Sequence, residues 1–200
     1  VDSHKLSVFV KLTEEFVHDA AFDMEERLTR RFAKNFAKAE DNAFLNGDGA
    51  NKPTGLLHAE NGAEVGATAK KLSFDDLIKL YASVKQEYRS KGTWLMNDDT
   101  ALFLRTMKDD SGAYLWNSDK DTILGKPVVI GEGMPNIESG KCPVLFGDFS
   151  YYWMIHRSPV RVRSLKEKFA LHGQVGYLAM EFVDGRLMRR EAVKALKITA

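Results

Sequence analysis

Hydrophobic residues recur every three or four positions between residues 17 and 43, which is the period of an α-helix. They form one stripe, made by Val17, Ala21, Met24, Leu28, Phe32, Phe36, Ala39 and Ala43. We therefore predict one long helix over residues 23–45, about 35 Å in length at about 1.5 Å per residue. Asp23 and Glu26 match a capping box at its start, and Glu26 is spaced for an ion pair with Arg30. Asn46-Gly47 predicts a left-handed stop.

Alternation of apolar and polar residues marks the clearest strands. Residues 5–12 alternate strictly, with Leu6, Val8, Val10 and Leu12 on one face, which predicts a half-buried strand. Residues 160–163 and 175–183 also alternate, the second run with Leu178, Met180 and Phe182 on one face. We predict that these two runs form a long hairpin whose polar loop covers residues 166–174. Shorter apolar runs predict strands at 93–96, 124–130, 143–146, 151–155 and 192–198.

Two more helices are predicted after the long one. Ser73 and Asp76 form a capping box that opens an amphipathic helix ending at Gly92. Asn97 or Asp98 caps another helix, with Leu102, Phe103 and Thr106 along it, and residues 61–70 suggest an exposed connection. Because helices and strands do not alternate regularly, we predict an α+β fold instead of parallel βαβ units.

Composition narrows the possible classes of protein. The chain has 200 residues, which suits one domain or two small ones, and its 44% hydrophobic and 28% charged content is typical of globular proteins. The net charge of +1 gives no reason to expect DNA binding by bulk electrostatics. The single cysteine rules out an internal disulfide, and no apolar run reaches the ~18 residues of a membrane span. Since no initiator Met or signal peptide is present, we expect a fragment that starts within a fold.

Residues suited to catalysis are scattered. Acidic pairs occur at 75–76, 98–99 and 109–110, but adjacent carboxylates point apart, so we interpret them as caps and turns. Cys142 has no activating neighbour beyond Lys141, which favours an inert thiol. The glycine-rich loop at 47–57 follows a helix, whereas a phosphate-binding loop follows a strand. No metal-ligand spacing joins the histidines His4, His18, His58, His156 and His172, so we predict no catalytic, cofactor-binding or metal-binding residue, and no cofactor.

Basic residues form two bands. One lies on the predicted long helix and the other on the predicted hairpin. A solvated face is the plain interpretation of both bands, with subunit contacts as the functional one, because the arginine fork binds carboxylates in a bidentate way. Our candidates for subunit contacts are Arg27, Arg30, Arg31, Arg161 and Arg163.

Several short motifs follow one another along the chain. They include Gly47-Asp48-Gly49, Pro53-Thr54-Gly55, residues 94–97, a turn at Gly112, Gly125-Lys126-Pro127, Gly147-Asp148-Phe149 and residues 183–186. In this order, over about residues 5–197, they resemble motifs of the major capsid proteins of tailed bacteriophages. These proteins have the Hong Kong ninety-seven-type fold, with a long spine helix.

The resemblance implies a peripheral domain (residues 1–50 and 156–187) and an axial domain with a mixed sheet (residues 51–155 and 188–200). It implies a structural protein, not an enzyme, that self-assembles into pentamers and hexamers of an icosahedral shell around DNA, without sequence-specific contact. Portal, scaffold and decoration proteins are implied partners, with no membrane. The implied location is the virion capsid, after assembly in the bacterial host cytoplasm.

Some relatives join subunits through an isopeptide bond between Lys and Asn. Residues 166–174 contain no Asn, and the loop that would carry the Lys would precede Val1, so we expect no such bond. We also expect this chain alone to be monomeric or to form small oligomers. Two alternatives remain open: an encapsulin-like nanocompartment shell protein with the same fold, and a metal-dependent hydrolase using Asp98, Asp99, Asp109 or Asp110.

Overall fold

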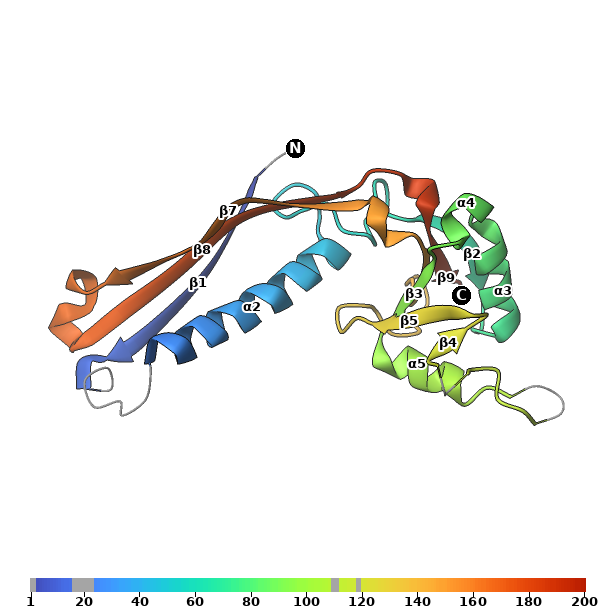
Figure 1. Cartoon of the computed structure of the whole chain (residues 1–200), viewed down its shortest axis with the longest axis horizontal. Helices are drawn as coiled ribbons and strands as arrows, with labels where there is room; N and C mark the ends of the chain where they lie inside the picture. The colour runs from blue at the N-terminus through green and yellow to red at the C-terminus, as the bar shows by residue number, and fades with distance from the viewer. Residues whose placement is uncertain (1–2, 16–23, 109–111, 118–119) are drawn as a thin grey trace.

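The computed structural model describes residues 3–15, 24–108, 112–117 and 120–200. It is elongated, with a narrow arm joined to a thicker lobe (Figure 1). The arm contains β1 (His4–Thr13), α2 (Met24–Asn46), β7 (Tyr152–Leu165), the 3-10 helix η2 (Glu167–His172) and β8 (Gln174–Leu187). The helices of the lobe are α3 (Phe74–Ser83), α4 (Gln86–Arg89), α5 (Asp98–Arg105), η1 (Phe149–Tyr151) and η3 (Arg190–Ala192). Its strands are β2 (Glu64–Ala69), β3 (Thr93–Met96), β4 (Thr122–Ile123), β5 (Lys126–Ile130), β6 (Val144–Gly147) and β9 (Val193–Ile198).

In the arm, α2 packs against one face of an antiparallel sheet with the order β1-β8-β7 (Figure 1). Phe32, Phe36 and Ala179 are buried between helix and sheet, and the inward residues of β1 pack around them. The long helix and the alternating first strand are thus confirmed. The predicted Glu26–Arg30 pair is also present, at 2.5 Å. Asp23, the first residue of the predicted capping box, lies outside the described residues.

The predicted left-handed stop at the end of the long helix is wrong. Neither Asn46 nor Gly47 has a positive φ. Instead, the chain crosses back over the helix end, so that a Cβ on Gly47 would lie 1.9 Å from the carbonyl oxygen of Pro53. Glycine is therefore suited to this position by close backbone approach, not by a left-handed turn.

The predicted hairpin is present, but tertiary packing decides which of its faces is buried. Ala179 pairs with Val8 of β1 and Val162 of β7, so β8 is the central strand. The alternating set that faces α2 contains Val175, Ala179 and Val183. The other set, which contains Leu178, Met180 and Phe182, lies on the face turned away from the helix, where Phe182 is exposed.

The lobe is built on a six-stranded sheet with the order β2-β9-β6-β3-β5-β4. The β2–β9 and β3–β5 pairs are parallel and the others antiparallel, which confirms the mixed sheet and the α+β class. The indole of Trp94 packs against Phe146 in a tilted arrangement, at 4.3 Å between ring centroids, and its N–H donates to the carbonyl of Ile123 at 3.0 Å. Asp76 accepts from both the backbone N–H and the hydroxyl of Ser73, which confirms the predicted capping box.

Residues 61–70 are not an exposed connection as predicted. They contain β2, which pairs in parallel with β9. A Cβ on Gly66 would lie 2.3 Å from the Ser83 hydroxyl oxygen and 2.9 Å from the Lys194 Cβ. The small residues that suggested a loop therefore allow α3 to pack closely on the strand.

The helix predicted between Ser73 and Gly92 is broken into α3 and α4. Val84 and Lys85 are extended, with ψ of 133° and 149°. The break buries Val84 completely, and Nε of Arg89 donates to the Val84 carbonyl oxygen at 2.6 Å. Burial and this hydrogen bond replace the helical bonds that a continuous helix would make.

The helix predicted after Asn97 is present, but its buried side differs from the prediction. Asn97 is the N-cap of α5 and accepts from the Thr100 N–H at 2.8 Å. Thr100, Ala101 and Leu104 are buried, whereas Leu102 and Phe103 are exposed. Small Ala101 lets this short helix lie close to the core. Among the described helices, none is both long and apolar enough to cross a membrane.

Candidate functional site

The loop after α2 connects the arm to the lobe and contains five of the predicted motif residues. The carboxylate of Asp48 accepts hydrogen bonds at 3.0 Å from the backbone N–H groups of Ala50, Asn51 and Lys52. These bonds, led by the one from Ala50, lower the pKa of Asp48. The loop is thus held by its own backbone donors, as in an Asx turn. Gly47, Asp48, Gly49, Pro53 and Gly55 all lie within it.

Hydrogen bonds fasten this loop to the hairpin. The Thr54 N–H donates to the Gly185 carbonyl and the Tyr152 hydroxyl donates to the Thr54 carbonyl, both at 2.9 Å. Burial raises the pKa of Tyr152, so its hydroxyl stays protonated as a donor. A Cβ on Gly55 would lie 2.5 Å from the Gly47 nitrogen, so the two ends of the loop touch. The motif therefore forms the junction between arm and lobe.

The remaining motif residues shape turns in the lobe. Leu124 and Gly125, with φ of 51° and 72°, make a two-residue turn before β5, where Pro127 pairs with Thr122. Asp148 caps η1 by accepting from Ser150 N–H at 3.0 Å. A Cβ on Gly147 would lie 2.1 Å from the Ala192 carbonyl oxygen, so a side chain does not fit there. Phe149 is partly buried against the cluster that contains Phe44. Gly112 has a positive φ of 84°. We interpret the glycines and Pro127 as positions that shape the backbone, Asp148 as a cap and Phe149 as a packing residue.

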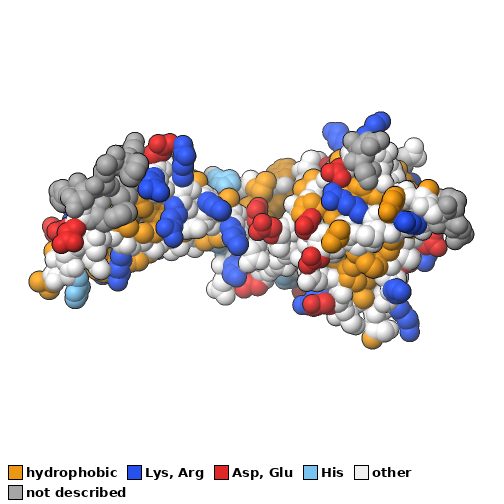
Figure 2. Space-filling view, turned by 90° about the horizontal axis from the view of Figure 1, so that it is seen from below, with side chains coloured by type: hydrophobic (Ala, Val, Ile, Leu, Met, Phe, Trp, Pro, Cys, Tyr) orange, Lys and Arg blue, Asp and Glu red, His pale blue; other side chains and the backbone are white. Residues whose placement is uncertain are grey.

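The basic candidates lie on two faces of the arm. Arg27, Arg30 and Arg31 are exposed on α2, and Figure 2 shows Lys and Arg side chains along the arm. Arg161 and Arg163 are exposed on β7, where they pair with Met180 and Leu178 on the face turned away from the helix. The structure therefore separates the two bands instead of combining them into one patch.

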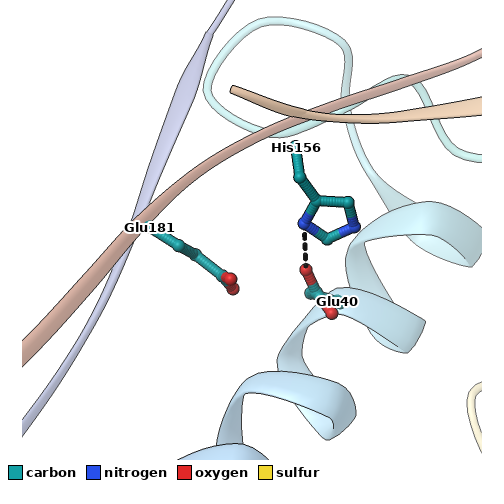
Figure 3. A group of neighbouring side chains, drawn as sticks. All are labelled: Glu40, His156 and Glu181. Carbon is teal, nitrogen blue, oxygen red and sulfur yellow. Dashed lines mark ion pairs between the residues drawn. The ribbon is translucent and has the colours of Figure 1, made fainter. Parts of the chain in front are cut away.

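A cluster of ionisable residues lies between helix and sheet that the sequence did not predict. It consists of Glu40 on α2, His156 on β7 and Glu181 on β8 (Figure 3). One ligand atom from each of the three lies within 4.8 Å of the other two, and Oε1 of Glu40 is 3.5 Å from Nδ1 of His156. Glu181 is only 4% exposed.

A signal for this cluster was present in the sequence. Glu40 lies four residues from both Phe36 and Phe44, so it interrupts the apolar side of the helix. Glu181 likewise lies between Ala179 and Val183 in the alternating set that faces the helix. The predicted alternation of this strand singles out the opposite face, with Leu178, Met180 and Phe182, and therefore leaves Glu181 out. Burial raises the pKa of Glu181, and the negative charge of Glu40 adds to the effect.

The acidic pair proposed for a hydrolase has a different setting. Asp98 and Asp99 are exposed in the first turn of α5, as expected for residues that favour the helix dipole. They line an open hollow of about 570 Å³ with Glu132, Glu138 and Lys141. Asp109 and Asp110 lie outside the described residues. Burial raises the pKa of the nearby Cys142, consistent with an unreactive thiol.

Comparison with known proteins decides the family. The model of the phage capsid family matches residues 1–198. The chain belongs to the phage capsid family. No curated protein sequence matches it.

Solved structures agree with the phage capsid assignment. The capsid of an empty GTA particle, computed with C5 symmetry, is 32% identical, with a TM-score of 0.86 over 98% of this chain and 74% of that one. The capsid of the native GTA particle is also 32% identical, with a TM-score of 0.84 over 99% and 73% of the two chains. A chain of Gordonia phage Cozz, at 15% identity, shares the fold with a TM-score of 0.69 over 99% and 70%. This chain is a phage capsid protein, and the resemblance seen in its motifs is confirmed.

Proposed function

We propose that this capsid protein forms pentamers and hexamers that close into an icosahedral shell around DNA. The supporting observation is its likeness along 98% of the chain to a capsid computed with C5 symmetry. A five-fold ring requires head-to-tail contacts between two different surfaces of each subunit. The arm offers two such surfaces, since its helix covers one side of the sheet and the opposite side is exposed.

In this proposal the arm corresponds to the peripheral domain and the lobe to the axial domain, except that residues 152–155, at the start of β7, count with the axial domain. The proposed boundaries are residues 1–50 with 156–187, and 51–155 with 188–200. They fall near the junction loop, whose hydrogen bonds to β7 and β8 join the two parts. The exposed arginines on both faces of the arm then meet carboxylates of two different neighbours, because guanidinium groups bind carboxylates in a bidentate way.

The proposal includes a place in the virion, after assembly in the bacterial host cytoplasm. Portal, scaffold and decoration proteins are its proposed partners, besides further copies of the chain. The proposal includes enclosure of DNA without sequence-specific contact, and the net charge of +1 gives no strong bulk attraction to DNA. Because shell formation requires no reaction, we propose a structural role without catalysis, and family membership favours this over the hydrolase.

Electron microscopy of particles formed by the full reading frame tests this function. We expect closed shells that contain nucleic acid, and particles filled with a folded enzyme would support the nanocompartment instead. Reversing two charges on the arm, R161E with R163E, should lower particle yield at least about tenfold, because like charges then face each other at a contact. The matched control reverses Lys70 and Lys71, two exposed residues of the lobe. Equal yields from both double variants would contradict the proposed contact.

A further inference from the structure

Two glutamates at the contact between helix and sheet in the arm, Glu40 and Glu181, each have a buried carboxylate oxygen without a hydrogen bond. Oε1 of Glu40 and Oε1 of Glu181 are both inaccessible to solvent, and neither accepts a hydrogen bond from the residues that the structure describes. Buried polar groups in proteins are nearly always hydrogen-bonded, and buried charges are paired or bind a metal. The two glutamates also repel each other when both are ionised. His156 lies 3.5 Å from Oε1 of Glu40, but this pair leaves Oε1 of Glu181 without a hydrogen bond, so a further group at this contact would supply a missing partner.

The neighbouring histidine indicates the chemistry of the missing partner. His156 reaches the same point from a third element, and its side chain remains 52% exposed, which leaves a route from solvent. Glu181 points from β8 toward the helix, and Glu40 and His156 face each other (Figure 3). A metal ion placed among the three groups would be a partner for both carboxylates and for the imidazole.

We propose that Glu40, His156 and Glu181 bind a divalent transition-metal ion of the zinc class. Ligands at about 2.1 Å from a tetrahedral ion are about 3.4 Å apart, which is close to the 3.5 Å between Glu40 and His156. The remaining separations are within 4.8 Å, so binding requires these side chains to move closer together. The imidazole nitrogen selects against Mg²⁺ and Ca²⁺, which prefer oxygen ligands only. Three protein ligands leave the fourth position for water.

This ion joins three elements of the arm. Its ligands come from α2, β7 and β8, between the apolar cluster around Phe36 and the one that contains Phe44. Metal binding therefore holds the long helix against the hairpin where apolar contact is interrupted. The site lies within one chain, so it does not depend on the proposed assembly.

Metal titration of the 200-residue chain tests the site directly. After treatment with a chelator, Zn²⁺ is added in a calorimeter and bound zinc is counted by mass spectrometry. We expect one Zn²⁺ per chain, a higher unfolding temperature with Zn²⁺ and no such shift with Mg²⁺. E181Q and H156A should weaken zinc binding by at least about tenfold to a hundredfold. H172A, which removes an exposed histidine of η2, should leave it unchanged.

The variants also show whether loss of binding reflects loss of fold. In chelator, E181Q should unfold at or above the temperature of the wild type, because it removes a buried carboxylate while keeping its shape. A folded E181Q variant without stoichiometric zinc supports the site. Zinc binding that is absent from the wild type, or equal in wild type, E181Q and H156A, overturns it. In that outcome the two glutamates share a proton in place of a metal.

Discussion

The arm and the lobe bury apolar surface in different ways. In the lobe, one cluster of eighteen buried residues includes Trp94, Phe146, Leu77 and Leu80. In the arm, the cluster between helix and sheet contains, among the described residues, three buried members: Phe32, Phe36 and Ala179. The sheet of the arm has three strands and is covered by α2 on one side, so its other face adds no apolar core within the described part of the chain. The lobe is therefore stabilised by its own core, whereas the arm has much less internal support.

The exposed side chains show the same contrast. β7, an edge strand of the arm, exposes Trp153 at 56%, Met154 at 59% and Val162 at 53%. Exposed apolar side chains on an edge strand are typical of surfaces that another chain covers. This difference fits a subunit whose lobe folds on its own and whose arm is completed by its neighbours in the proposed shell.

Truncating one tryptophan in each part is the strongest test of this contrast. W94A should lower the free energy of unfolding by about 3–5 kcal/mol, because it leaves a cavity in a closed core. W153A, the matched control in the arm, should change it by less than about 1 kcal/mol, since that side chain is mostly exposed. Urea unfolding measures both values. Equal losses would show that Trp153 in the arm is packed as closely as Trp94 in the lobe.

A substitution in the junction loop tests whether the arm and the lobe unfold together. G47A should cost about 2–3 kcal/mol, because the new methyl group collides with the backbone of Pro53. The control is G173A, at a left-handed glycine with no atom within 4 Å of the new Cβ, where the conformational cost is about 1–2 kcal/mol. Differential scanning calorimetry measures both. A single transition in G47A indicates coupled parts, and two transitions would separate them.

The smallest expected changes in unfolding free energy come from two polar contacts, one in the lobe and one in the arm. Burial tends to raise the pKa of Asp76, but hydrogen bonds from Ser73 and Lys79 outweigh it and hold the pKa below 3.8. Because the folded-state pKa is lowered, this carboxylate stabilises the fold above pH 3.8, and the contribution is lost as pH falls through the folded value. D76N should therefore cost about 1–2 kcal/mol at pH 7 and less in acid.

Two controls accompany that measurement. D75N changes the adjacent exposed aspartate and should have little effect at any pH. R30A removes the exposed pair with Glu26 in the arm and should cost at most about 0.5 kcal/mol. Urea unfolding at several pH values gives all three curves. A pH-independent loss in D76N would contradict the role assigned to its charge.

Local patterns were sufficient for several elements of this protein. The long helix is found at Met24–Asn46, within one residue of the predicted 23–45. An apolar stripe of period 3.6 over more than twenty residues matches an α-helix and no other regular secondary structure. The first strand and the capping box at Ser73 were also predictable, since each depends on neighbours in sequence. The motif residues marked turns and the junction loop, although their exact contacts depend on distant backbone.

Tertiary structure alone decided the rest. Gly66 has the sequence pattern of a loop, but in the structure it lies in a strand against which α3 packs. Val84 fits the helical period, but in the structure it is extended and buried in the core. Both faces of β8 alternate equally well, so only the position of α2 determines that Glu181 is buried and meets Glu40 and His156. Sequence patterns report what a residue can do within its own element. Which face is buried, and which distant charges meet, depends on packing between elements that no local period contains.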